Sequence, residues 1–264
     1  MDILKTDDAG NPVELVTPII TMERKSAGNT VRVDLIAAVH FAEQDYYEEL
    51  NRRFTRYQVI LVEMIAPKGT TLAQIAGSAG KKAGKLSRVG ILETLQRGMG
   101  QSLGLVSQID AVDYSAKNMV LADMDAETLF SRIRENGELG RLAGETFRGL
   151  WREDDTEPQA DDGTDEPELS LTRFLLSRDK RRLLKRVFAV EIARNQSEGN
   201  TLFEDSLIRD RNTILLAELR RQVKKGIRSL GVFYGAVHIP DIQRRLEEDG
   251  YRAVRREELT AWRL

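Results

Sequence analysis

The chain contains no cysteine, only two histidines and no long apolar run. Without cysteine it can form no disulfide framework, no thiolate metal site and no cysteine nucleophile. No apolar stretch approaches the roughly 18 residues that a transmembrane helix requires, so we expect no membrane span. Forty Lys and Arg against 42 Asp and Glu give a formal net charge of -2. The molecule as a whole therefore has no electrostatic attraction to nucleic acid or to anionic membranes.

The remaining composition is that of an ordinary globular protein. Its 264 residues are 41% hydrophobic and 31% charged, which suits a single domain spanning 1–264. The N-terminal sequence MDILKTDDAG lacks the basic and then apolar order of a signal peptide. We therefore expect a soluble, cytoplasmic protein, with an exported, periplasmic protein as the alternative if a leader has been removed.

Both histidines end the tripeptide Ala-Val-His, and each tripeptide closes an apolar run. His40 follows VRVDLIAAV and His238 follows LGVFYGAV, which are runs typical of buried strands. A helical pattern, a tyrosine and a second strand come next in both places, the second strands being expected at 59–64 and 253–254. In a βαβ unit the first strand ends at the carboxyl edge of the sheet. We therefore expect both imidazoles at one edge; the alternative is two separate, structurally satisfied histidines.

Two further features place polar residues in apolar surroundings. Glu63 lies in the run VILVEM, where an unpaired carboxylate would be costly, so it needs a cation, a metal ion or a proton as partner. The purely structural alternative is a buried Glu-Arg pair. Asp210-Arg211-Asn212 lies at or near the start of an amphipathic helix predicted to run to about Lys225.

The middle of the chain, about 70–205, is predicted to be a helical insertion because its apolar residues recur at helical spacing. Within it, residues 153–168 contain nine acidic residues, two prolines and no large apolar side chain, which predicts a disordered linker. Basic residues are in excess after Leu169, but they share a helix with an apolar stripe and no aromatic residues interleave with them. That pattern favours a solvated helix face over a nucleic-acid site.

The joint occurrence of these motifs resembles the TraB/GumN/PrgY/Tiki superfamily. Its members carry two GxxH motifs, a glutamate ending the strand after the first, and a Glu-Arg-Asn-like triplet on the helix before the second. The matching residues are Ala37-Ala38-Val39-His40, Glu63, Asp210-Arg211-Asn212 and Gly235-Ala236-Val237-His238. The resemblance spans about residues 30–256. Ala37 departs from the first motif glycine, and Asp210 departs from the more usual glutamate.

The resemblance implies an α/β domain of the erythromycin esterase-like, or Tiki, type. Such a domain has a central mixed, largely parallel sheet with flanking helices and a helical insertion. Tiki-type members are described as divalent-metal-dependent proteases, and PrgY and TraB members act in peptide-pheromone shutdown. A segment similar to bacterial TraB-like proteins further implies a structural or site role for Asp113, Tyr114, Asp123 and Asp125.

Our leading hypothesis is a metal-dependent hydrolase that acts on a peptide or a small molecule. His40, His238 and Glu63 would hold a divalent ion such as Mn, Co or Zn with an open position for water. The family pattern makes Glu63, Arg211 and Asn212 catalytic. The alternatives are a metal-free hydrolase with a histidine general base and a non-catalytic module that binds a peptide or acidic ligand. Homo-oligomerisation is left open.

Overall fold

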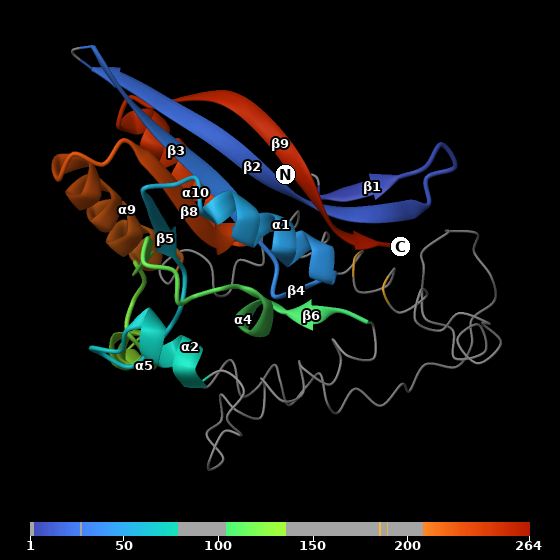
Figure 1. Ribbon diagram of the computed structural model, residues 1–264, viewed down its shortest axis with the longest axis horizontal. Coiled ribbons are helices and arrows are strands. Elements are labelled where there is room, and N and C mark those ends of the chain that lie inside the picture. The colour runs from blue at the N-terminus through green and yellow to red at the C-terminus, as the bar shows by residue number, and fades with distance from the viewer. Residues whose placement is uncertain (1–2, 27, 79–103, 136–184, 186–188, 190–207) are drawn as a thin grey trace.

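The computed structural model describes residues 3–26, 28–78, 104–135, 185, 189 and 208–264 (Figure 1). The strands in these ranges are β1 (Leu4–Thr6), β2 (Pro12–Ser26), β3 (Asn29–Ala38), β4 (Phe41–Ala42), β5 (Val59–Val62), β6 (Val106–Ser107), β7 (Met119–Leu121), β8 (Ser229–Gly235) and β9 (Arg252–Arg263). The helices are α1 (Gln44–Phe54), α2 (Leu72–Ser78), α4 (Gln108–Ala111), α5 (Ala126–Glu135), α9 (Arg209–Lys224), the short 3-10 helix η2 (Ala236–His238) and α10 (Ile239–Glu248).

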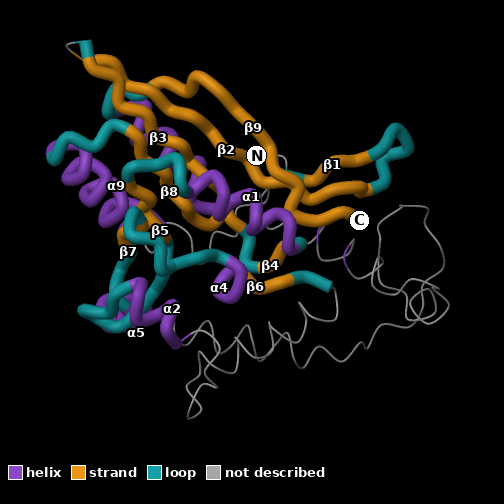
Figure 2. The backbone as a smooth tube through the Cα atoms, in the orientation of Figure 1, coloured by secondary structure: helices purple, strands orange, loops and turns teal. Residues whose placement is uncertain are grey.

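Seven of the nine described strands form one mixed sheet, which with its flanking helices confirms the predicted α/β class. β3, β8, β5 and β7 are parallel neighbours in that order. β2 continues the sheet antiparallel to β3, and it also pairs antiparallel with β1 and β9. Figure 2 shows β2, β3 and β9 running side by side as a long, twisted wing. β4 and β6 make a separate two-stranded ribbon.

Helices cover both faces of the parallel part of the sheet, which explains why its strands are largely apolar. One core joins α1 to the first face and includes Ile36, Tyr47, Leu50, Ile60 and Phe233. The other joins α9 and α10 to the opposite face and includes Leu35, Leu61, Leu215, Val232 and Leu246. The chain is therefore layered as helix, sheet and helix.

The connections that leave β3 and β8 go to opposite faces of the sheet. From β3 the chain passes through α1 on one face and enters β5, on the far side of β8. From β8 it passes through α10 on the other face and enters β9, in the antiparallel wing. In open α/β sheets, ligands bind outside the carboxyl ends of strands at such a switch point. The residues that follow β3, β8 and β5 are therefore the candidates for a ligand site.

Four elements differ from the sequence-based expectations. The strand expected at 253–254 is twelve residues long as β9, and the sequence patterns had not indicated β1 or β2. β9 lies at a sheet edge with most of its first half exposed, so its charged sequence shows little of the alternation that marks a strand. β7 belongs to the main sheet although it lies inside the segment expected to be a helical insertion.

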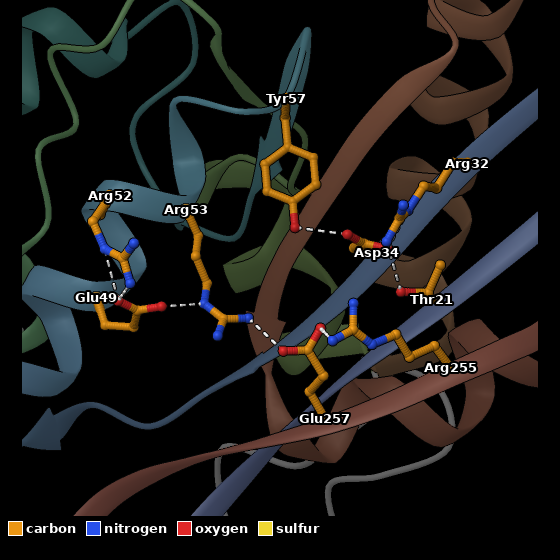
Figure 3. Close-up of polar contacts among 9 residues, drawn as sticks. All are labelled: Thr21, Arg32, Asp34, Glu49, Arg52, Arg53, Tyr57, Arg255 and Glu257. Atoms are coloured by element: carbon orange, nitrogen blue, oxygen red, sulfur yellow. Dashed lines mark hydrogen bonds and ion pairs between the residues drawn. The ribbon is translucent and has the colours of Figure 1, made fainter.

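Polar contacts fasten α1 to the antiparallel wing (Figure 3). Arg53 near the end of α1 donates to Glu49 Oε1 at 2.5 Å and to Glu257 Oε2 of β9 at 3.0 Å. The hydroxyl of Tyr57 donates to Asp34 Oδ2 of β3 at 2.8 Å. The Arg53 bond ties the last turn of α1 to β9, and the Tyr57 bond ties the connection between α1 and β5 to β3.

Most of the predicted helical insertion and all of the acidic stretch 153–168 lie outside the described residues. Of the helices that are described, none combines the length and the apolar character needed to cross a membrane.

Candidate functional site

Polar side chains from four segments meet beyond the carboxyl ends of the parallel strands. Glu63 directly follows β5, Asp123 follows β7 by two residues, and His238 ends the 3-10 helix after β8. Arg211 and Asn212 lie in the first turn of α9. We call these five residues the Arg211 cluster, because its guanidinium contacts three of the other four.

The guanidinium of Arg211 holds two carboxylates. Its Nε and Nη2 donate to Asp123 Oδ1 and Oδ2 at 2.9 and 2.7 Å, which is a bidentate pair. Nη2 also donates to Glu63 Oε1 at 2.5 Å. The side chains of Arg211, Glu63 and Asp123 are 12%, 18% and 0% exposed, so these contacts are largely shielded from solvent. Such charge-assisted bonds are about twice as strong as neutral ones.

Glu63 is fixed at both of its carboxylate oxygens. Oε2 accepts the backbone N–H of Gly235 at 2.6 Å, and a Cβ at Gly235 would lie only 3.1 Å from that oxygen. Burial by itself would raise the pKa of Glu63. The hydrogen bond and charge of His238, the charge of Arg211 and the Gly235 N–H more than offset burial and hold that pKa well below its ordinary value of 4.5. Glu63 is therefore a carboxylate at neutral pH.

A chain of hydrogen bonds orients the imidazole of His238. Asn212 Nδ2 donates to Asp241 Oδ2 at 2.8 Å, so Asn212 Oδ1 must be the acceptor for His238 Nδ1 at 2.7 Å. Nδ1 therefore carries a hydrogen, and Nε2 is the nitrogen that can gain or lose a proton. Nε2 lies 3.3 Å from Arg211 Nη1 and 3.4 Å from Glu63 Oε1. A neutral Nε2 accepts from the guanidinium, and a protonated Nε2 donates to the carboxylate.

Tyr234 packs against this imidazole. Its ring meets that of His238 edge to face, with centroids 5.3 Å apart and an interplanar angle of 82°. Its hydroxyl donates to the carbonyl of Ala122. Burial first, and then the charges of Asp123 and Glu63, raise the pKa of Tyr234, so the phenol stays protonated and neutral.

The two Ala-Val-His tripeptides leave the sheet from adjacent strands, because Ala38 of β3 pairs with Gly235 of β8. His238 is buried, whereas His40 is exposed. Within the described ranges no hydrogen bond joins the ring of His40 to the Arg211 cluster. Of the predicted metal ligands His40, His238 and Glu63, the last two are in contact, with 3.4 Å between His238 Nε2 and Glu63 Oε1.

The remaining residues singled out by the sequence separate into two groups. Asp123 enters the cluster. Asp125 accepts from the N–H and hydroxyl of Thr128 at the start of α5, and Asp113 does the same for Ser115, so both organise local backbone. The hydroxyl of the buried Tyr114 accepts from Gln108 at 2.9 Å. Asp210 pairs with Arg132 at 2.9 Å, outside the cluster.

Sequence reasoning missed Asp241 and left the role of Asp123, structural or in the site, unassigned. Asp241 lies in the first turn of α10, three residues after His238, and it is also bound by Arg245 at 2.9 Å. An acidic residue in a first helical turn is common for dipole reasons alone. Its sequence position therefore carried no distinct signal.

The family resemblance implies a bound divalent ion, so the side chains of the Arg211 cluster can be compared with the ligands that such an ion needs. No group of three or more His, Cys, Asp or Glu among the residues described is arranged to hold a metal ion. The guanidinium of Arg211 lies in contact with Glu63, Asp123 and His238, where a cation would have to bind. As arranged, these groups fit the guanidinium that they hold, and a divalent ion would require Arg211 to withdraw.

Comparisons of the chain with protein-family models, curated proteins and solved structures find no match. The resemblance to the TraB/GumN/PrgY/Tiki superfamily therefore stays a prediction carried by the quoted motifs.

Proposed function

We propose that the chain is a hydrolase of peptide or ester bonds in which His238 is the general base and no metal ion is required. The observation that carries the proposal is the hydrogen-bonded series Asp241, Asn212 and His238, which fixes the tautomer and leaves Nε2 facing Glu63 and Arg211. A base oriented by a third group is the common arrangement for acyl-transfer chemistry.

In this mechanism a water molecule replaces Arg211 Nη1 as the hydrogen-bond partner of the His238 Nε2 lone pair and attacks the carbonyl carbon of the substrate. Nε2 takes the proton of the water as the new C–O bond forms, and the carbonyl oxygen becomes an oxyanion. The imidazolium then gives its proton to the leaving amine or alkoxide as the tetrahedral intermediate collapses. Glu63, 3.4 Å from Nε2, stabilises the imidazolium between these two steps.

Arg211 is the group available to the oxyanion. Four of its five N–H bonds are directed to Asp123, Glu63 and His238, and the second N–H of Nη1 has no partner among the described residues. The two carboxylates hold the guanidinium in place, so it needs no reorganisation when the oxyanion charge develops. Since His238 is only 2% exposed, water and substrate reach Nε2 from the side on which Glu63 and Arg211 are partly exposed.

The test compares His238→Gln with His40→Gln on a panel of peptides and activated esters, with and without a metal chelator. We expect His238→Gln to lower kcat by about 100- to 10,000-fold, the usual contribution of a general base. His40→Gln and the chelator should leave the rate nearly unchanged, because His40 is exposed and outside the cluster.

The competing hypotheses give different results in the same experiment. A metal-dependent hydrolase with His40, His238 and Glu63 as ligands would lose activity with the chelator, and His40→Gln would lose both metal and activity. A non-catalytic module that binds peptide or acidic ligands would bind members of the panel and turn over none. Either outcome would contradict the proposed mechanism.

A further inference from the structure

A pocket lies at the other end of α9 from Arg211. Its volume is about 310 Å³, and it is lined by Arg24, Arg220, Val223, Lys224, Asp249 and Tyr251. Arg24 comes from β2, the next three residues from the last turns of α9, and the last two from the turn that joins α10 to β9. The pocket therefore lies at the opposite end of α9 from the Arg211 cluster, beside the turns that lead into β8 and β9.

Tyr251 lines this pocket, and its buried hydroxyl is a donor without a partner in the described part of the chain. The side chain is 1% exposed, and its oxygen is the one buried side-chain polar atom in the described part of the chain that has no hydrogen-bond partner there. Buried polar atoms in folded proteins almost always have a partner, which can be a ligand or an ordered water. The guanidinium of Arg24 lies over the ring of Tyr251, 4.7 Å from its centroid.

The charged groups that line the pocket are mainly cationic. Arg220 pairs with Asp249 at 2.8 Å. Arg24 donates to the backbone carbonyl of Asp249 at 3.2 Å, and neither Arg24 nor Lys224 has an ion pair among the described residues. Three cations thus line the pocket with one carboxylate, and that carboxylate is already engaged. Arg24 also neutralises the carbonyl end of α10, which would otherwise repel an anion.

We propose that this pocket binds the phosphate group of a small molecule. Arginine and lysine side chains offer only donors, and the Tyr251 hydroxyl can add one more, so the complementary ligand is an anion rich in acceptor oxygens. A phosphate monoester brings three such oxygens and close to two negative charges at neutral pH, which matches three cations and one carboxylate. The volume is at the small end of the range for ligand pockets, about 300–1,000 Å³, so it suits a phosphate with one compact substituent.

Binding can be measured by calorimetry and by phosphorus NMR at constant ionic strength, with inorganic phosphate, phenyl phosphate and acetate as probes. We expect saturable, one-site binding of the two phosphates and much weaker binding of acetate. Tighter binding of phenyl phosphate identifies a phosphorylated small molecule as the ligand, and equal binding identifies the free ion. Equal binding of acetate, or no saturable binding of either phosphate, overturns the proposal.

Three variants locate the binding. Lys224→Gln should weaken phosphate binding by about tenfold to a hundredfold, the contribution of a hydrogen bond to a charged group. Tyr251→Phe should weaken it by about twofold to tenfold and should still fold, because the hydroxyl it removes has no partner among the described residues. Lys225→Gln is the matched control, since Lys225 is exposed and does not line the pocket. If the control weakens binding as much as Lys224→Gln, the attraction is diffuse surface charge and the assignment is wrong.

Discussion

Replacing Arg211 with Met should destabilise the protein by about 3 to 5 kcal/mol at pH 7, the usual cost of removing one partner of a buried ion pair. The variant removes the guanidinium that neutralises Glu63 and Asp123, whose side chains are 18% and 0% exposed. Glu63 keeps the Gly235 N–H and His238 as partners, which places the cost within that range and not above it. For a protein of this size the midpoint of thermal unfolding should fall by about 6 to 20 °C.

The cost of Arg211→Met should also depend on pH. In the native protein the pKa of Glu63 is lowered, so its contribution to stability is complete above the ordinary value of 4.5 and is lost as the pH falls through the folded-state pKa. Without Arg211 one cause of the lowering disappears while burial remains, so the pKa of Glu63 rises and the variant has less to lose in acid. The difference between the two proteins should therefore be largest near neutral pH and shrink below about pH 4.5.

Urea unfolding followed by circular dichroism at pH 7 and pH 4 measures both effects. Arg221→Met is the matched control, because Arg221 lies on the same helix, is 55% exposed and pairs with Glu218 one turn away. That exposed pair should contribute less than about 1 kcal/mol at either pH. If Arg211→Met costs no more than the control, or costs the same at both pH values, the ion-pair reasoning is refuted.

Three further changes test other parts of the molecule. Gly235→Ala puts a Cβ 3.1 Å from Glu63 Oε2, and overpacking of this kind should cost about 1 to 3 kcal/mol in urea unfolding; an unchanged unfolding midpoint would mean that Glu63 can move freely. Tyr57→Phe removes the 2.8 Å bond to the buried Asp34, and a loss of about 1 to 3 kcal/mol is expected in the same assay; a loss below about 0.5 kcal/mol would show that the bond adds nothing. Deleting residues 153–168 should shift the thermal midpoint little, since loop-closure entropy depends weakly on length; a loss above about 8 °C would reveal a packed element there.

The parallel strands and the polar residues at their ends could be predicted from the sequence because these strands are buried. β5, β8 and the second half of β3 are buried on both faces, so their sequences are largely apolar and stand out from the rest of the chain. A polar residue that ends or interrupts such a run, as Glu63 and His238 do, is conspicuous for the same reason. Arg211 and Asn212 required the family pattern, because a charged triplet in the first turn of a helix is otherwise unremarkable.

The pairing of distant segments could not be predicted in this way. Nothing in the sequence indicates that β8 lies between β3 and β5, or that β9 pairs with β2. Asp241 acts through Asn212, and that relation exists only once α9 and α10 pack together. The exposure of His40 likewise depends on how the chain turns after β3, although its tripeptide is identical to that of His238.

The position of β8 has a consequence for how the chain folds during synthesis. β3 and β5 each pair with β8 and have no hydrogen-bonded register with one another. Until residues 229–235 have left the ribosome, both strands lack their common neighbour and present apolar, unpaired edges. Parallel pairing across so long a sequence separation is slow, and exposed strand edges of this kind are prone to aggregate. A chain that stops before Ser229 should therefore depend on chaperones. A separate peptide containing β8 and α10 should be able to bind such a chain by pairing between β3 and β5.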